Sequence, residues 1–158
     1  MKSKKVIKQH EISANLKHPK NSESPTGYLN KHPVWAFQSC DIQCQEWSIT
    51  TCDSFYDVII TKLASFEGMT WGGNTKGIWG KKKGTNSHFE KISDMCNDAQ
   101  KRAEEIHLDV DELFSLRLTG ELRLYGILQD GVFSIIWYDP CHKVYPVKKN
   151  GYSNFSVD

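Results

Sequence analysis

The last third of the chain constrains the fold most. Polar and apolar residues alternate there in three runs, 112–118, 121–128 and 132–138. Alternation with a period of two is typical of strands, and short turns separate these runs. The turn before the last run is Asp130-Gly131, a strong hairpin signal, because a type I′ turn needs positive φ at both central residues. The sequence therefore predicts three consecutive antiparallel strands, in which Phe133, Ile135 and Trp137 share one face.

Two amphipathic helices are predicted before these strands. The first covers about 54–67 and ends at Gly68, with apolar residues at helical spacing at Phe55, Val58, Ile59, Leu63 and Phe66. The second covers about 94–106 and carries a narrow apolar stripe formed by Cys96, Ala99, Ala103 and Ile106.

A hairpin is also predicted, from two short aromatic and β-branched runs at 34–37 and 46–49 that flank a turn at 41–43. These elements together indicate an α+β fold class. We expect a central twisted antiparallel sheet built on the meander 112–138, with both helices packed on one face. The hairpin would extend that sheet or cover its edge.

The chain has room for one domain of ordinary size, with 158 residues and a mass of 18.1 kDa. Hydrophobic residues make up 39% of it, which is enough to build a core. Residues 1–32 are polar and rich in lysine and turn formers, so we expect a flexible basic arm there. Residues 33–148 would form the domain, and 149–158 a polar tail.

Charge and cysteine content narrow the partners and the compartment. The net charge of +1 is too small for a protein that coats nucleic acid by charge alone, so such a partner would meet a local basic patch. The five cysteines are odd in number, and no apolar segment of signal-peptide length follows the basic N-terminus. We therefore expect free thiols, a cytoplasmic location and no membrane span.

The sequence gives no motif for a metal or a cofactor. Cys40 and Cys44 form one close pair, but a structural zinc site needs a second pair, and the remaining cysteines are scattered. Segment 80–84 lacks both the preceding strand and the Gly-Lys-Ser/Thr ending of a phosphate-binding loop. We therefore expect no metal site and no cofactor.

A cationic and aromatic group remains, mostly in segment 71–88. The candidate nucleic-acid ligands are Lys76, Lys81, Lys82, Lys83, Trp71, Trp79 and Lys143. Lysines contact phosphates, and aromatic side chains stack on bases without demanding a sequence. Alternatively, the lysines form a solvated loop and the two tryptophans cover the core.

The candidate catalytic residues are His142, Arg123, Arg117, Tyr145 and His88. Arg117 and Arg123 flank the Thr119-Gly120 turn at positions close to opposite, so both guanidinium groups can reach one phosphate. A histidine can act as an acid or base near neutral pH. Alternatively, the arginines are outward-facing strand residues and His142 is an ordinary turn residue.

Residues 113–145, LFSLRLTGELRLYGILQDGVFSIIWYDPCHKVY, carry two resemblances. They resemble the ending of a group of small, largely uncharacterised bacterial proteins with the pattern W-[YFL]-D-x-x-H, and the tract from 55 to 89 is similar to that group too. Residues 93–146 also resemble the RelE/ParE superfamily of toxins. Its pattern is a helix, a strand ending in Arg-Leu, a glycine turn, an arginine-bearing strand and a last hairpin strand.

The RelE/ParE resemblance implies a function. Ribonuclease members of that superfamily cut mRNA on the ribosome without metal, whereas other members inhibit gyrase. By resemblance, Arg117 and Arg123 would contact RNA, and His142 or Tyr145 would supply an acid or base. The implied partners are RNA or the ribosome and a small acidic antitoxin.

We therefore expect a toxin-like RNA endonuclease or translation inhibitor. Two alternatives remain open. One is a non-enzymatic module that binds nucleic acid or protein through segment 71–88. The other is a non-nucleolytic enzyme that uses His88 and His142.

Overall fold

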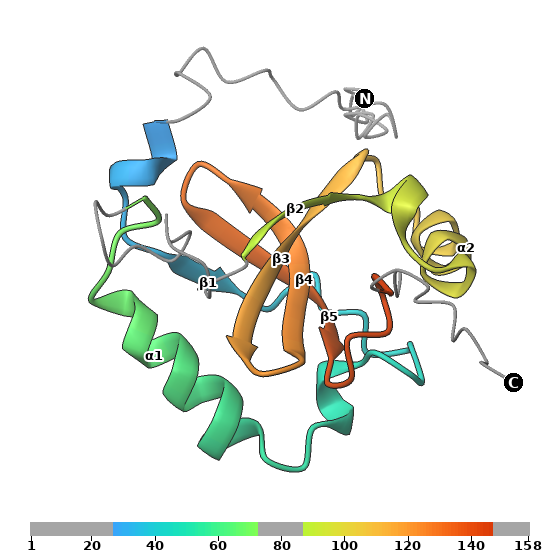
Figure 1. Ribbon diagram of the computed structural model, residues 1–158, viewed down its shortest axis with the longest axis horizontal. Helices are drawn as coiled ribbons and strands as arrows, with labels where there is room; N and C mark the ends of the chain where they lie inside the picture. The colour runs from blue at the N-terminus through green and yellow to red at the C-terminus, as the bar shows by residue number, and fades with distance from the viewer. Residues whose placement is uncertain (1–26, 73–86, 147–158) are drawn as a thin grey trace, which may run out of the picture.

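The computed structural model describes residues 27–72 and 87–146 and contains one five-stranded sheet (Figure 1). Its strands are β1 (Val34–Ala36), β2 (His88–Lys91), β3 (Glu112–Thr119), β4 (Leu122–Gln129) and β5 (Val132–Asp139). Their spatial order is β1-β5-β4-β3-β2. Strands β2 to β5 are antiparallel neighbours, whereas β1 runs parallel to β5 at the other edge. The sheet is therefore mixed, and the α+β class is confirmed.

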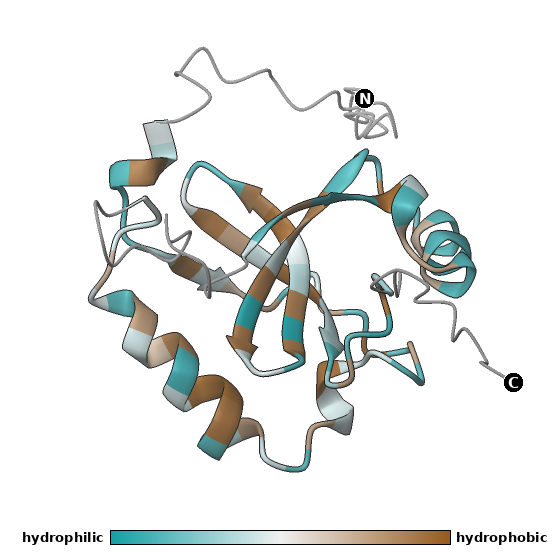
Figure 2. Ribbon diagram, in the orientation of Figure 1, coloured by the Kyte–Doolittle hydropathy of each residue, from teal (hydrophilic) through white to brown (hydrophobic). Residues whose placement is uncertain are grey.

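The predicted meander is confirmed as β3, β4 and β5, each within one residue of its expected bounds. Asp130 and Gly131 have φ values of 54° and 84°, as a type I′ turn requires. Figure 2 shows that these strands are largely hydrophobic, which fits a sheet covered on both faces.

The prediction that Trp137 shares a face with Phe133 and Ile135 is wrong. Tyr125 pairs with Trp137 and the next residue, Gly126, pairs with Ile135, so Ile136 is an extra residue in β5. This β-bulge interrupts the alternation. Phe133 and Ile135 therefore belong to the core on one face, and Trp137 belongs to the core on the other.

Both predicted helices form. A π-helical segment, Phe55–Ile60, continues into α1 (Thr61–Glu67), and α2 spans Asn97–Glu105. The sheet has two cores, and each helix contributes to a different one. We call the side of α1 the first face and the side of α2 the second face.

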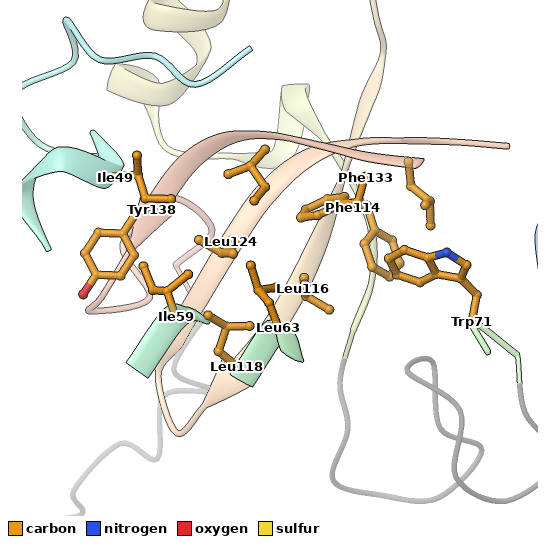
Figure 3. Close-up of a cluster of buried hydrophobic side chains, with 12 residues drawn as sticks. Ile49, Ile59, Leu63, Trp71, Phe114, Leu116, Leu118, Leu124, Phe133 and Tyr138 are labelled. Atoms are coloured by element: carbon orange, nitrogen blue, oxygen red, sulfur yellow. The ribbon is translucent and has the colours of Figure 1, made fainter. Parts of the chain in front are cut away.

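The prediction that both helices pack on one face is wrong. On the first face, Ile59 and Leu63 pack with the even-numbered residues of β3, as Figure 3 shows for Leu116. On the second face, Ala99 and Ala103 of α2 pack with Leu113, Tyr125, Ile136 and Trp137. Since β3 and β4 supply apolar side chains to both faces, one helix layer leaves the other face uncovered.

The predicted hairpin at 34–49 is also wrong. Only its first run forms a strand, β1, and the second forms turns that lead into a 3-10 helix, Ile49–Thr51. The segment instead crosses the second face, where Trp47 packs on Trp137 with ring centroids 5.6 Å apart. Instead of the expected ladder, two backbone hydrogen bonds join the segment to β5. One runs from the Asp41 N–H to the Ile136 carbonyl at 3.0 Å, and the other from the Tyr138 N–H to the Trp47 carbonyl at 2.8 Å.

Asp41 fastens this crossing segment to α2 and β5. Its carboxylate accepts two hydrogen bonds of 2.7 Å from Arg102 and one of 3.1 Å from the indole N–H of Trp137. The Arg102 guanidinium keeps the pKa of Asp41 below its usual value. A bidentate pair of this kind fixes the direction as well as the distance between the two groups.

The predicted arm 1–32 is described only from Gly27 onward. A 3-10 helix, Gly27–Asn30, begins the described chain, and the Trp71 N–H donates to the Lys31 carbonyl at 3.1 Å. Residues 27–32 therefore pack with the domain. Residues 1–26, 73–86 and 147–158 lie outside the described part, and with them most of the predicted arm, of the lysine-rich segment and of the tail.

All five cysteines are free. Within 27–72 and 87–146, no helix is long and apolar enough to cross a membrane.

We predict that Gly126→Ala strongly destabilises the fold. A Cβ at this position would lie 2.2 Å from the Ser134 carbonyl oxygen and 2.9 Å from the Phe133 ring. The free energy of unfolding, measured by urea denaturation, should fall by about 3 kcal/mol or more, because backbone blocks the added methyl. Gly68→Ala is the matched control, since a Cβ there meets nothing within 4 Å. Equal effects of the two changes would contradict the prediction.

Candidate active site on the second face

Strand register gathers polar side chains on the second face. Arg117 lies opposite Arg123, which lies opposite Asp139 on β5. In the neighbouring row, His88 lies opposite Ser115, which lies opposite Tyr125. Residues two apart on a strand share a face, so both rows point the same way. We call His88, Glu90, Ser115, Arg117, Arg123 and Tyr125 the polar cluster.

Glu90 supplies the carboxyl group of the polar cluster. It is 6% exposed, and its Oε1 lies 2.8 Å from Nε2 of His88. Burial raises the pKa of Glu90 to about 7, with Arg123 opposing the rise and Asp139 adding to it. The carboxyl therefore titrates near neutral pH, where small changes in its surroundings alter its charge.

Oε2 of Glu90 is buried and has no hydrogen-bond partner among the described residues. Oγ of Ser115 and the phenol oxygen of Tyr125 are buried as well, and Ser115 is near enough to act on the pKa of Tyr125 by hydrogen bonding, which lowers it. Burial, followed by the charge of Glu90, raises the pKa of Tyr125, so its hydroxyl keeps its proton. Buried polar atoms normally have partners, so Oε2 of Glu90 is an acceptor that the described residues leave unused.

Arg117 and Arg123 lie opposite each other, as expected, but they differ in their surroundings. Arg123 is 5% exposed, and its Nη1 donates to the carbonyls of Gly120 at 2.8 Å and Leu122 at 3.1 Å. Burial and the neighbouring Arg117 lower the pKa of Arg123. Arg123 therefore braces the β3–β4 turn, and the half-buried Arg117 is the more accessible of the two.

Asp139 holds the turn that carries His142. Its buried carboxylate accepts hydrogen bonds from the backbone N–H groups of Cys141 at 3.2 Å, Lys143 at 3.0 Å and Val144 at 2.8 Å. His142 has a φ of 55° and is half-buried, and its Nδ1 has no partner within the described chain. Because Asp139 lies opposite Arg123, this turn is attached beside the polar cluster.

The other predicted residues divide into three groups. Tyr145 packs partly buried against the second-face core, and Lys143 is exposed in the same turn. Trp71 is fully buried and donates its indole N–H to the Gly131 carbonyl at 3.0 Å, so the prediction that it stacks on bases is wrong. Lys76, Trp79, Lys81, Lys82 and Lys83 lie outside the described residues.

Sequence reasoning missed Glu90, Ser115 and Tyr125. Glu90 follows His88 by two residues, which would have placed both on one face of a strand. Ser115 stands between Phe114 and Leu116 in β3, two residues before Arg117. These signals depend on knowing that β2 exists and pairs with β3.

The described residues contain no group of three or more His, Cys, Asp or Glu side chains placed to hold a metal ion. Comparisons of the chain with family models, curated proteins and solved structures found no match.

We predict that Glu90→Gln stabilises the protein in a pH-dependent way. Since the folded pKa of Glu90 is about 7 and its ordinary value is 4.5, the folded state binds more protons between these values. Stability is therefore lost as the pH rises through this window. The neutral amide should raise the free energy of unfolding by roughly 2–3 kcal/mol at pH 8 and by little at pH 4.5.

Urea denaturation at the two pH values measures this difference. Glu121→Gln is the control, because Glu121 is exposed in the β3–β4 turn and should show no such dependence. An effect of Glu90→Gln that is the same at both pH values would show that its charge is not the cause.

Proposed function

We propose that the protein is a metal-independent endoribonuclease whose active site is the polar cluster. The observation that carries this proposal is the His88–Glu90 pair beside Arg117. The His88 side chain is 51% exposed, whereas that of Glu90 is 4% exposed. A buried carboxylate that orients an accessible imidazole is a common arrangement for general acid–base catalysis.

RNA is the substrate that suits such a site, because it carries its own nucleophile. His88 takes the proton of a ribose 2′-hydroxyl while that oxygen attacks the adjacent phosphorus. The bond from phosphorus to the 5′-oxygen breaks, and an acid returns a proton to the leaving oxygen. The products are a 2′,3′-cyclic phosphate and a 5′-hydroxyl end, and no cofactor takes part.

Other residues of the site have roles in this scheme. Arg117 would hold the phosphate and stabilise the charge that develops on it. Glu90 is a positioning residue that acts through His88. His142 is our candidate for the acid, because its turn is anchored opposite Arg123. The resemblance of residues 93–146 to RelE/ParE toxins supports the same reaction, and a small acidic antitoxin that covers Arg117 would suit the inhibited state.

The test uses the purified chain with single-stranded RNA and with the same strand carrying 2′-deoxyribose throughout, both in EDTA. A separate arm adds ribosomes in buffer with Mg²⁺ and without EDTA, because ribosomes dissociate when Mg²⁺ is removed. We expect the RNA to be cleaved and the deoxyribose strand to stay intact. The cleaved RNA should carry a 2′,3′-cyclic phosphate end. His88→Ala and Arg117→Ala should each slow cleavage roughly 10²–10³-fold. Glu90→Gln should shift the pH profile of the rate, as a positioning role requires.

His107→Asn is the matched control. His107 is an exposed histidine after α2 with a φ of 55°, a conformation that asparagine tolerates. The His107→Asn variant should cleave RNA at the wild-type rate. If the chain cuts no RNA with or without ribosomes, the nuclease proposal is rejected and a non-enzymatic binding module becomes the leading function.

A further inference from the structure

Strands β3 and β4 diverge at one end of the sheet. Their pairing ends at Phe114 and Gly126, whereas β2 follows β3 back to Glu112 and β5 follows β4 to Gln129. The two strand pairs therefore separate like the arms of a V (Figure 1). A cleft of about 1360 Å³ includes residues of both arms in its walls.

Backbone hydrogen-bonding groups face this cleft from both arms. The Ile92 N–H donates to the Asp111 carbonyl at 2.9 Å, so the antiparallel alternation directs the N–H and C=O of Glu112 away from β2. On the other arm, the two-residue turn makes Gln129 and Val132 a hydrogen-bonded pair. The alternation then directs the N–H and C=O of Leu128 away from β5.

Glu112 and Leu128 would be the next pair if the β3–β4 ladder continued, but their strands have separated. Two strand edges with unused donors and acceptors are a template for an additional strand. The cleft therefore suits an extended segment that bonds to both arms.

The lining of the cleft indicates the chemistry of that segment. Its acidic residues include Glu104, Asp111 and Glu112, against a single lysine, Lys91, within the lining. Its apolar residues come from both sides of the sheet and include Tyr28, Phe89, Leu108, Val110, Ile127 and Leu128. A cationic strand with apolar side chains on both faces would match such walls.

We propose that the occupant is the chain's own N-terminal segment, with Lys4–Lys8 as the added strand. The segment 1–26 contains six lysines and two glutamates, opposite in sign to the cleft. It joins the fold at Gly27, directly before Tyr28 in the wall of the cleft. Tyr28 and Glu112 both line the cleft, and the charge of Glu112 contributes, after burial, to raising the pKa of Tyr28.

The sequence Lys-Lys-Val-Ile-Lys suits the position. Val6 and Ile7 are β-branched, and successive side chains of a strand point to opposite faces, so each would meet one apolar wall. The flanking lysines would lie near the carboxylates. Residues 9–26 can span up to about 60 Å, so the connection to Gly27 imposes no strain.

Amide hydrogen exchange of the full chain, followed residue by residue by NMR, tests the proposal. We expect the amides of Glu112 and Leu128 to be protected in the wild type. Val6→Asp with Ile7→Asp should accelerate their exchange about tenfold or more, because the added strand detaches. The amide of Leu124, in the paired part of β4, should stay protected and reports that the fold is intact.

Ile12→Asp with Leu16→Asp is the matched control, with the same change of charge and apolar content elsewhere in the segment. It should leave the exchange of Glu112 and Leu128 at the wild-type rate. Rapid exchange of both amides in the wild type would overturn the proposal. It would do so even if adding another protein slowed that exchange, because the occupant would then not be the N-terminal segment. Protection that survives Val6→Asp with Ile7→Asp would overturn it as well.

Discussion

The contact between Gly126 and the bulged strand β5 is the constraint on which the rest of the structure depends. Gly126 lies opposite Ile135, and a Cβ at Gly126 would reach within 2.2 Å of the Ser134 carbonyl oxygen. This close approach accompanies the extra residue Ile136, which reverses the faces of everything that follows in β5. The reversal puts Trp137 in the second-face core and Asp139 beside Arg123. With uninterrupted alternation, Asp139 would point to the first face. Gly126 also forms the last pair between β4 and β3, so the cleft begins where the bulge does.

Charge balance on the second face follows from that placement. Arg117 and Arg123 lie opposite each other, and two cations so close need acidic neighbours. Glu90 and Asp139 supply them, but in different ways. The Asp139 carboxylate is satisfied by three backbone N–H groups, whereas one oxygen of Glu90 has no partner among the described residues. Asp139 is therefore committed to holding its turn, and Glu90 is the acidic group whose charge can change.

The sequence predicted those features that depend on local pattern. Alternation located β3 to β5, Asp130-Gly131 located the hairpin, and turn length placed Arg117 opposite Arg123. It did not predict the bulge, because Gly126 has no local signal that tells a close backbone approach from a flexible strand position. It missed the second helix layer because sequence spacing does not say which face of a sheet a helix covers. The burial of Trp71 was one of the two alternatives left open, and only its packing against the sheet decides between them.

Edge position explains why the two members of the acid–base pair differ so much in exposure. β2 is a short strand at the edge of the sheet, with β3 as its neighbour. Glu90 pairs with Leu113, a residue of the second-face core, and is buried with it. His88 pairs with Ser115 at the other end of β2, and its side chain is half exposed. The imidazole is thus accessible to a large substrate, while its carboxylate partner remains in surroundings that keep its pKa near neutrality. A central strand, covered along its whole length, cannot combine these two conditions within two residues.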